Sequence, residues 1–311
     1  MWRREKNVQC GGRRACWDTI LRTWRRGGGV PSLRARLLDE LGGWQTRLPQ
    51  PWRSVLRGVE LDFAGVHPRG SISDGDRVWP QSTAGPASAH VFKALRDVAP
   101  GGVRVVIFGN DPYTQIDQAT GRSFEQGDLT SWRGDFDEIS PSLKSILCGA
   151  AATDRAHRGY ELAQASYRAH RELRRCVEDD ALRLPSPRRV FGHWARQGVL
   201  WLNRSLTYTR WDDDHRNSHR ALWRPFIDRV IAELVRRSEQ RRPVLFVLWG
   251  GKARELERVI ARAMRHAGSV STAAQVVRAL HPQYPGNFFR TGNTFTDINQ
   301  RLPSAARVRW T

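Results

Sequence analysis

The sequence predicts an α/β fold in which a central four-stranded parallel sheet is covered by helices on both faces. Three observations support this prediction. Four short apolar runs of strand length recur along the chain, helical segments lie between them, and the runs are continuous rather than alternating. Strands that alternate with helices indicate a parallel sheet, and continuous apolar runs indicate strands that are buried on both sides.

The four predicted strands all lie beyond residue 100. They are VRVVIFG (103–109), VLWLN (199–203), VLFVLWG (244–250) and QVVRALHP (275–282). Because each run is short and is followed by polar residues or glycine, we expect the chain to leave the sheet at the end of each run.

Apolar residues at helical spacing predict the helices between these strands. The predicted segments are HVFKALRDV (90–98), RELRRCVEDDALR (171–183), RPFIDRVIAELVRR (224–237) and ARELERVIARAMRHAG (253–268), the last ending at a glycine suited to a C-cap. The connection 115–198 is long for a single crossover, so we expect it to contain loops and at least one helix.

The first 50 residues differ from the rest of the chain. They are rich in arginine and are interrupted by three glycines (27–29) and Pro31, and their one helical stripe is formed by leucines 33, 37, 38 and 41. We therefore expect a basic N-terminal arm over 1–50, with one helix and with a solvated tail as the alternative, followed by one folded domain over 51–311.

Composition restricts the class of protein. The chain has 311 residues, a formal net charge of +20 and a pI of about 11.2, and such a field attracts nucleic acid, anionic membranes or acidic proteins. A bias towards arginine could explain its excess over lysine but not the excess of basic over acidic residues. Four scattered cysteines favour a reducing compartment, and we find no transmembrane stretch and no secretory signal. We therefore expect a cytoplasmic protein, nucleoid-associated if bacterial, without membrane contact.

Polar residues follow all four predicted strands. In an open parallel sheet the carboxyl ends of the strands share one edge, where ligands bind, so we expect an acid, an amide, a glycine turn and an imidazole to converge there. Each residue alone also has a structural explanation, as a turn initiator, a strand cap or an edge histidine. The residues are Asn110-Asp111, Asn203, Gly250-Gly251-Lys252 and His281-Pro282.

A second polar cluster, formed by Asp212, Asp213, Asp214, His215 and His219, resembles a metal site. HRNSH has HxxxH spacing but lacks the adjacent glutamate of a metalloprotease helix. We expect it to precede the helix at 224–237 and to form a solvated acidic loop. The glycines at 27–29 and 101–102 lack nucleotide-binding spacings, so we predict neither a metal nor a cofactor.

Six ordered motifs resemble those of the family 1 uracil-DNA glycosylases over about 50–310. GNDPYT (109–114) is similar to GQDPYH, GRSF (121–124) to GLCF, and SPSLKSIL (140–147) to PPSLKNIY. RQGVLWLNRSLTY (196–208) is similar to KQGVLLLNAVLTV, LWGGKA (248–253) to LWGSYA, and HP with FFRTGNTFTDIN to HPSPLS with GFFGCKHFSKTN. The resemblance implies a monomeric enzyme that hydrolyses the N-glycosidic bond of uracil in DNA and leaves an abasic site, with no metal or cofactor.

The matched positions imply roles for individual residues. Asp111 would orient the attacking water, and His281 would donate a hydrogen bond to uracil O2. The base would be bound by Phe124, which stacks on its face, by Asn203, which reads its O4 and N3–H edge, and by Tyr113 and Asn110. The residues implied in DNA binding are Ser142, Gly250, Gly251, Pro282, Tyr284 and Pro285.

The sequence also departs from the family pattern. Asn110 replaces glutamine, Thr114 replaces histidine and Gly251 replaces serine, and the loop after His281 is about three residues shorter than the one that carries the family's leucine wedge. Tyr284 or Pro285 could replace that wedge; otherwise the enzyme would prefer single strands, where extruding a base costs least. Two alternatives stay open: a non-catalytic or slow DNA-binding relative, and a glycosylase for another damaged base.

Overall fold

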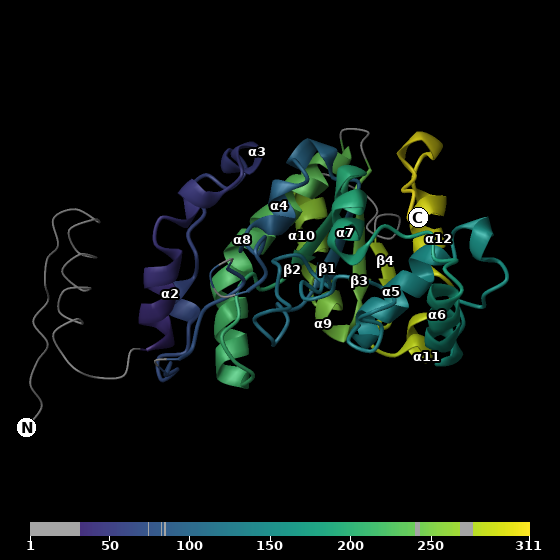
Figure 1. Cartoon of the computed structure of the whole chain (residues 1–311). Helices are drawn as coiled ribbons and strands as arrows, with labels where there is room; N and C mark the ends of the chain where they lie inside the picture. The colour runs from purple at the N-terminus through teal and green to yellow at the C-terminus, as the bar shows by residue number, and fades with distance from the viewer. Residues whose placement is uncertain (1–31, 74, 82, 84, 240–242, 268–275) are drawn as a thin grey trace, which may run out of the picture.

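The computed structural model describes residues 32–311 apart from 74, 82, 84, 240–242 and 268–275 (Figure 1). The predicted arm therefore lies outside the described residues up to position 31. The helices described include none with the length and apolarity needed to cross a bilayer.

The predicted parallel sheet is confirmed. Its strands are β1 (Val105–Gly109), β2 (Val199–Asn203), β3 (Leu245–Trp249) and β4 (Val276–Ala279), in the order β2-β1-β3-β4, and all three pairings are parallel. The register places Gly109 opposite Asn203 and Trp249 opposite Ala279. All residues of β1, β2 and β3 are buried, as continuous apolar runs predict.

Helices cover both faces of the sheet, and alternate side chains of each strand point to opposite faces. Val106 and Phe108 belong to the core shared with α8 (Asp213–Glu239) and α10 (Glu257–His266). Val105 and Ile107 belong to the second core, which the other large helices cover (Figure 1). These are α5 (Pro141–Ala151), α6 (Arg168–Glu178), α7 (Pro187–Arg196) and α12 (Thr294–Arg301).

Shorter helical elements connect these layers. The α-helical ones are α3 (Gln50–Arg53), α4 (Lys93–Arg96), α9 (Gly250–Arg254) and α11 (Pro285–Phe288), and the 3₁₀ turns are Trp44–Arg47, Phe63–Gly65, Pro100–Gly102, Arg155–His157 and Ser304–Ala306. The helix predicted over 90–98 is reduced to α4. The one predicted over 253–268 is divided into α9 and α10.

The segment before residue 50 packs on the domain. Helix α2 (Leu33–Leu41) is capped by Ser32, whose Oγ accepts a hydrogen bond from the Ala35 amide at 3.2 Å. The leucines at 33, 37 and 41 are buried, and the ring of Trp44 lies 5.9 Å from that of Phe92. A solvated tail therefore does not describe 32–48, which completes the core.

Helix α8 begins at Asp213, eleven residues before the predicted start, so the expectation that HRNSH precedes the helix was wrong. Its first turns are polar and lack an apolar pattern, although acids suit a helix N-terminus. Both histidines in this segment have protein partners. The ring nitrogens of His215 lie 2.7 Å from Asp212 Oδ1 and 2.9 Å from the Ser71 carbonyl, and those of His219 contact two threonine hydroxyls. No group of potential metal ligands is found among the residues that the structure describes.

Candidate active site

Most of the predicted site residues follow the carboxyl ends of the four strands, at the lower edge of the sheet in Figure 1, whereas Phe124 comes from the loop after β1 and Ser142 from α5. Helices α9 and α11 and the first turns of α8 lie at the same edge. Side chains from distant parts of the sequence therefore meet beside β1, as the parallel topology predicts.

Asn203 ends β2 beside Gly109, its partner in the register. Its side chain is almost fully buried, and a Cβ atom on Gly109 would lie 2.3 Å from Asn203 Oδ1. Only glycine at position 109 leaves the carboxamide in place. Within the described part of the chain the Asn203 carboxamide has no hydrogen-bond partner. It is available to a ligand, since a buried amide without partners is costly.

Phe124 provides an aromatic surface between β2, β3 and the residues after β4. Its ring centroid lies 6.2 Å from that of Trp201, 5.6 Å from that of Trp249 and 6.3 Å from that of His281. Its backbone has φ of 62°, a conformation that bulky residues rarely adopt and that clusters at functional sites. The ion pair between Arg122 and Glu125, both nearly buried, fixes the loop on either side.

Tyr113 is held against Phe124. Its hydroxyl donates to the Phe124 carbonyl at 3.2 Å and lies 2.8 Å from Ser140 Oγ, at the N-cap of α5. Trp79 Nε1 donates to the Tyr113 carbonyl at 2.9 Å. Burial raises the pKa of Tyr113 to about 12, so the phenol stays neutral. Tyr113 is thus a rigid, uncharged wall.

His281 follows β4 and presents one ring nitrogen as a donor. Its Nδ1 accepts a hydrogen bond from the Gln283 amide at 3.2 Å, which places the proton of the neutral ring on Nε2. Burial lowers the pKa of His281, favouring that neutral form. A Cβ atom on Gly250, where φ is 84°, would lie 3.0 Å from His281 Cβ, so glycine is required there.

Asp111 is bound by two arginines that the sequence did not reveal. Arg220 donates from Nε to Oδ1 at 3.2 Å and from Nη2 to Oδ2 at 2.7 Å, and Arg216 Nη2 lies 3.5 Å from Oδ2. The Asp111 side chain is only 8% exposed. Both arginines lie four residues apart on α8, more than 100 residues from Asp111, and that separation hid the pair. Their spacing on the helix after β2 was the available signal.

The remaining predicted residues differ in exposure. Asn110 Oδ1 is buried and has no partner among the described residues. Ser142 lies half-buried in the first turn of α5, and Gly251 is exposed, with open space where a Cβ atom would lie. Of the residues after His281, Pro282 and Pro285 are buried, whereas Tyr284 is 49% exposed. Tyr284 therefore faces solvent and Pro285 does not.

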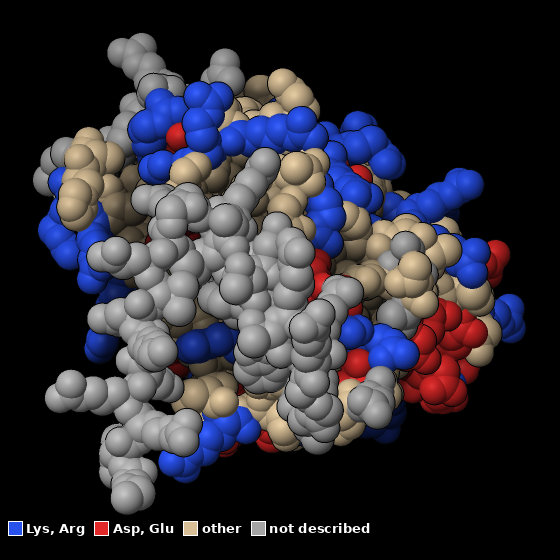
Figure 2. Space-filling model, turned by 90° about the vertical axis from the view of Figure 1, so that its left-hand side faces the viewer, with Lys and Arg blue, Asp and Glu red and all other residues tan. Residues whose placement is uncertain are grey.

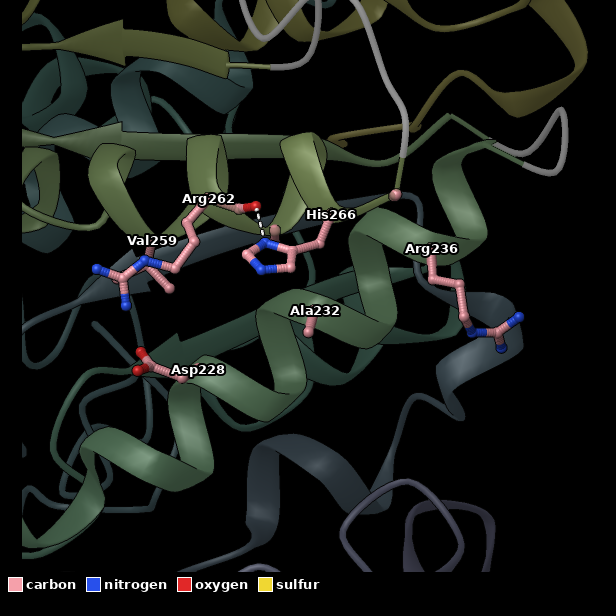
Figure 3. Close-up of a pocket in the computed structure, with 8 residues that line it drawn as sticks. Asp228, Ala232, Arg236, Val259, Arg262 and His266 are labelled. Carbon is pink, nitrogen blue, oxygen red and sulfur yellow. Dashed lines mark hydrogen bonds between the residues drawn. The ribbon is translucent and has the colours of Figure 1, made fainter.

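A separate hollow of about 330 Å³ lies between α8 and α10 (Figure 3). Asp228 and Arg262 point into it from the two helices. A hydrogen bond of 2.7 Å joins His266 Nδ1 and the Arg262 carbonyl oxygen. Burial raises the pKa of Asp228. None of its lining residues belongs to the predicted site.

Comparisons with known proteins agree with the fold and the motifs. The sequence model of the Uracil DNA glycosylase superfamily matches residues 96–302. The uracil-DNA glycosylase of Streptococcus uberis is 32% identical over 238 residues, covering 73% of this chain and 86% of that protein. The uracil-DNA glycosylase of Bordetella pertussis is 30% identical over 254 residues, covering 78% of this chain and 81% of that protein.

Solved structures share the fold at lower identity. The wild-type UNG of Nitratifractor salsuginis has a TM-score of 0.54 at 20% identity, covering 85% of this chain and 94% of that one. A mimivirus UNG variant in complex with UGI has a TM-score of 0.54 at 17% identity, covering 86% of this chain and 90% of that one. The family model and the relatives together show that the chain belongs to the uracil-DNA glycosylase superfamily.

Proposed function

We propose that this enzyme hydrolyses the N-glycosidic bond of uracil in DNA, releasing the base and leaving an abasic site. One observation carries the proposal: the ring of Phe124, packed against Trp201, Trp249 and His281, lies at the same sheet edge as the unpartnered carboxamide of Asn203. Such a site suits a flat ring with a donor and an acceptor on one edge. A base in a duplex cannot reach it unless it is extruded.

Recognition of uracil would follow from Asn203 and Tyr113. A carboxamide offers both a donor and an acceptor, which complements the O4 and N3–H groups of uracil, whereas cytosine presents the reverse pattern. Tyr113, fixed by Ser140 and the Phe124 carbonyl, would occupy the space beside C5, where thymine carries a methyl group. Asn110, with a buried and unpartnered Oδ1, is a further acceptor near the base.

Bond cleavage would depend on Asp111 and His281. The leaving base gains negative charge at O2, which the Nε2–H of neutral His281 would stabilise, and donors aimed at developing charge contribute roughly 3–4 kcal/mol each. The sugar gains positive charge, which the Asp111 carboxylate would stabilise. Asp111 would also orient the water, a role typically worth 10²–10⁴-fold for a positioned base.

The two arginines would fix the orientation of this carboxylate. Arg220 takes one acceptor position on each Asp111 oxygen, and Arg216 approaches only Oδ2. Because a carboxylate oxygen has about two acceptor positions, Oδ1 keeps one for the water. The arginines therefore determine which oxygen meets the nucleophile.

DNA is the proposed partner of a monomeric, cytoplasmic enzyme. The net charge of +20 favours a polyanion. On the face drawn in Figure 2, Lys and Arg side chains spread mainly over the upper part, away from the sheet edge that carries the site, so this charge would attract DNA through the overall field rather than through a local basic patch at the site. Ser142 and the Gly250-Gly251 turn would contact phosphates. Tyr284 would approach the bases, on a loop shaped by the buried Pro282 and Pro285.

A glycosylase assay tests the proposal. Labelled oligonucleotides with uracil, in single and double strands, are incubated with the purified protein and with the Asp111→Asn variant as control. We expect free uracil from the wild type and a rate at least about 10²-fold lower from the variant. Undiminished turnover by Asp111→Asn would contradict the assignment. DNA binding without release of any base would favour a non-catalytic relative, and release of another damaged base would reassign the substrate.

A further inference from the structure

We infer that the indole of Trp211 stacks on a base next to the extruded uracil, and that this contact is made with an unpaired DNA strand. The inference rests on the proposed function and adds a substrate subsite to it. Trp211 lies between β2 and α8, outside the group of residues that surround the base.

The indole of Trp211 is both exposed and held in place. Its exposed fraction is 66%, the highest among the described large apolar side chains. The Arg216 guanidinium lies over the ring, 4.1 Å from its centroid, and the buried Tyr208 contacts it at 6.5 Å between centroids. Isolated exposed aromatics are common, but a ring fixed by a cation on one face is already ordered. Its other face can bind without the entropy cost of ordering a mobile side chain.

Arg216 links this ring directly to the proposed reaction centre. The guanidinium that covers Trp211 also lies 3.5 Å from Asp111 Oδ2. Since a single guanidinium separates them, the indole is no more than about 9 Å from the carboxylate. A base that stacks on Trp211 would therefore belong to a nucleotide adjacent to the one whose glycosidic bond is at Asp111.

A second exposed aromatic lies on the opposite flank. The sheet order is β2-β1-β3-β4; Trp211 follows β2 at one end, and Tyr284 follows β4 at the other. Asp111, after the inner strand β1, lies between them. A strand that crosses this edge would meet an aromatic on each side of the extruded base.

The chemistry of such a ring favours single strands. Every base has a π-face, and stacking on an aromatic side chain is tolerant of sequence. In a duplex both faces of a paired base are already stacked on its neighbours, so a lateral platform gains less. The free energy of stacking one base on an aromatic side chain corresponds to about a 5- to 150-fold change in affinity.

The test combines two changes at the same contact. Uracil release from single-stranded oligonucleotides is measured for the wild type, Trp211→Ala and Trp211→Phe, using strands in which the 5′ or the 3′ neighbour of uracil is an abasic analogue. We expect Trp211→Ala to raise KM about 5- to 150-fold on the intact strand, and Trp211→Phe, which keeps an aromatic face, to recover most of that loss.

The abasic strands decide whether the contact is to a base. With one of the two abasic strands, the KM of the wild type should rise about as much as Trp211→Ala raises it on the intact strand. The same strand should raise the KM of Trp211→Ala no further. The inference is overturned if Trp211→Ala has the KM of the wild type. It is also overturned if the increase in KM caused by Trp211→Ala adds in full to the increase caused by each of the two abasic strands. If the wild type releases no uracil at all, the proposed function fails instead, so the two failures are distinguishable.

Discussion

The pair formed by Asp111 and Arg220 makes a measurable prediction about stability. Replacing Arg220 with methionine keeps much of the side-chain volume but removes both hydrogen bonds to the carboxylate. The Asp111 charge is then left nearly buried, with only the longer 3.5 Å contact from Arg216. The variant should therefore be less stable than the wild type.

The magnitude follows from the geometry of the pair. Breaking a buried ion pair from one side costs about 3–5 kcal/mol, and Arg216 remains nearby, so we expect about 3 kcal/mol for Arg220→Met. In an Asp111→Asn background the uncompensated charge is absent, and the same change should cost about 1 kcal/mol. The coupling free energy between the two positions is therefore about 2 kcal/mol.

Chemical denaturation of the wild type, the two single variants and the double variant measures this coupling. Arg216→Met is the matched control, because it removes one weak contact to the same carboxylate and should cost about 1 kcal/mol or less. Equal costs of Arg220→Met in the two backgrounds would refute the reasoning, since the guanidinium would then stabilise the fold independently of Asp111.

Three further predictions follow from other features. Gly109→Ala should displace the Asn203 carboxamide, because its Cβ would lie 2.3 Å from Oδ1; we expect kcat/KM for uracil release to fall at least about 10-fold, and an unchanged value would show that Asn203 does not read the base. If about five phosphates are contacted, the log–log dependence of duplex affinity on salt should have a slope of about −4.5, and a flat dependence would argue against DNA. Burial lowers the pKa of His90 and His170 to about 4 and that of His219 to about 3. Because the unfolded chain then binds protons that the folded chain does not, the free energy of unfolding should fall as pH drops from about 6.5 to about 4. Denaturation midpoints that increase as the pH is lowered would contradict the burial of these neutral histidines.

The sheet was predictable because its strands are buried on both faces. VLWLN coincides with β2 to the residue, and the other three runs contain the observed strands. Parallel pairing then brings the segments that carry Asp111, Asn203 and His281 to one edge of the sheet. The start of α8 was not predictable in the same way, because its first eleven residues have no apolar stripe and Pro225 lies within the helix.

Contacts between distant parts of the chain account for the rest of what the sequence did not predict. Arg216 and Arg220 are two of many arginines, and although their four-residue spacing puts them on one side of a helix, that spacing does not identify the carboxylate they bind. Only the folded chain shows that both reach Asp111, and that one of them also covers Trp211. Pairings of this kind depend on three-dimensional position, which periodicity does not encode.

The packing of residues 32–48 affects how the protein can be handled. The family match begins at residue 96, yet Trp44 contacts Phe92 and Phe226, and α2 buries three leucines. A version that starts at residue 51 would lack Trp44 and leave Phe92 and Phe226 without it, and one trimmed to the matched region would leave Phe226 without both partners, so either would favour insoluble product. Recombinant versions should start ahead of Ser32, and loss of activity in shorter ones would reflect a broken core rather than a missing catalytic group.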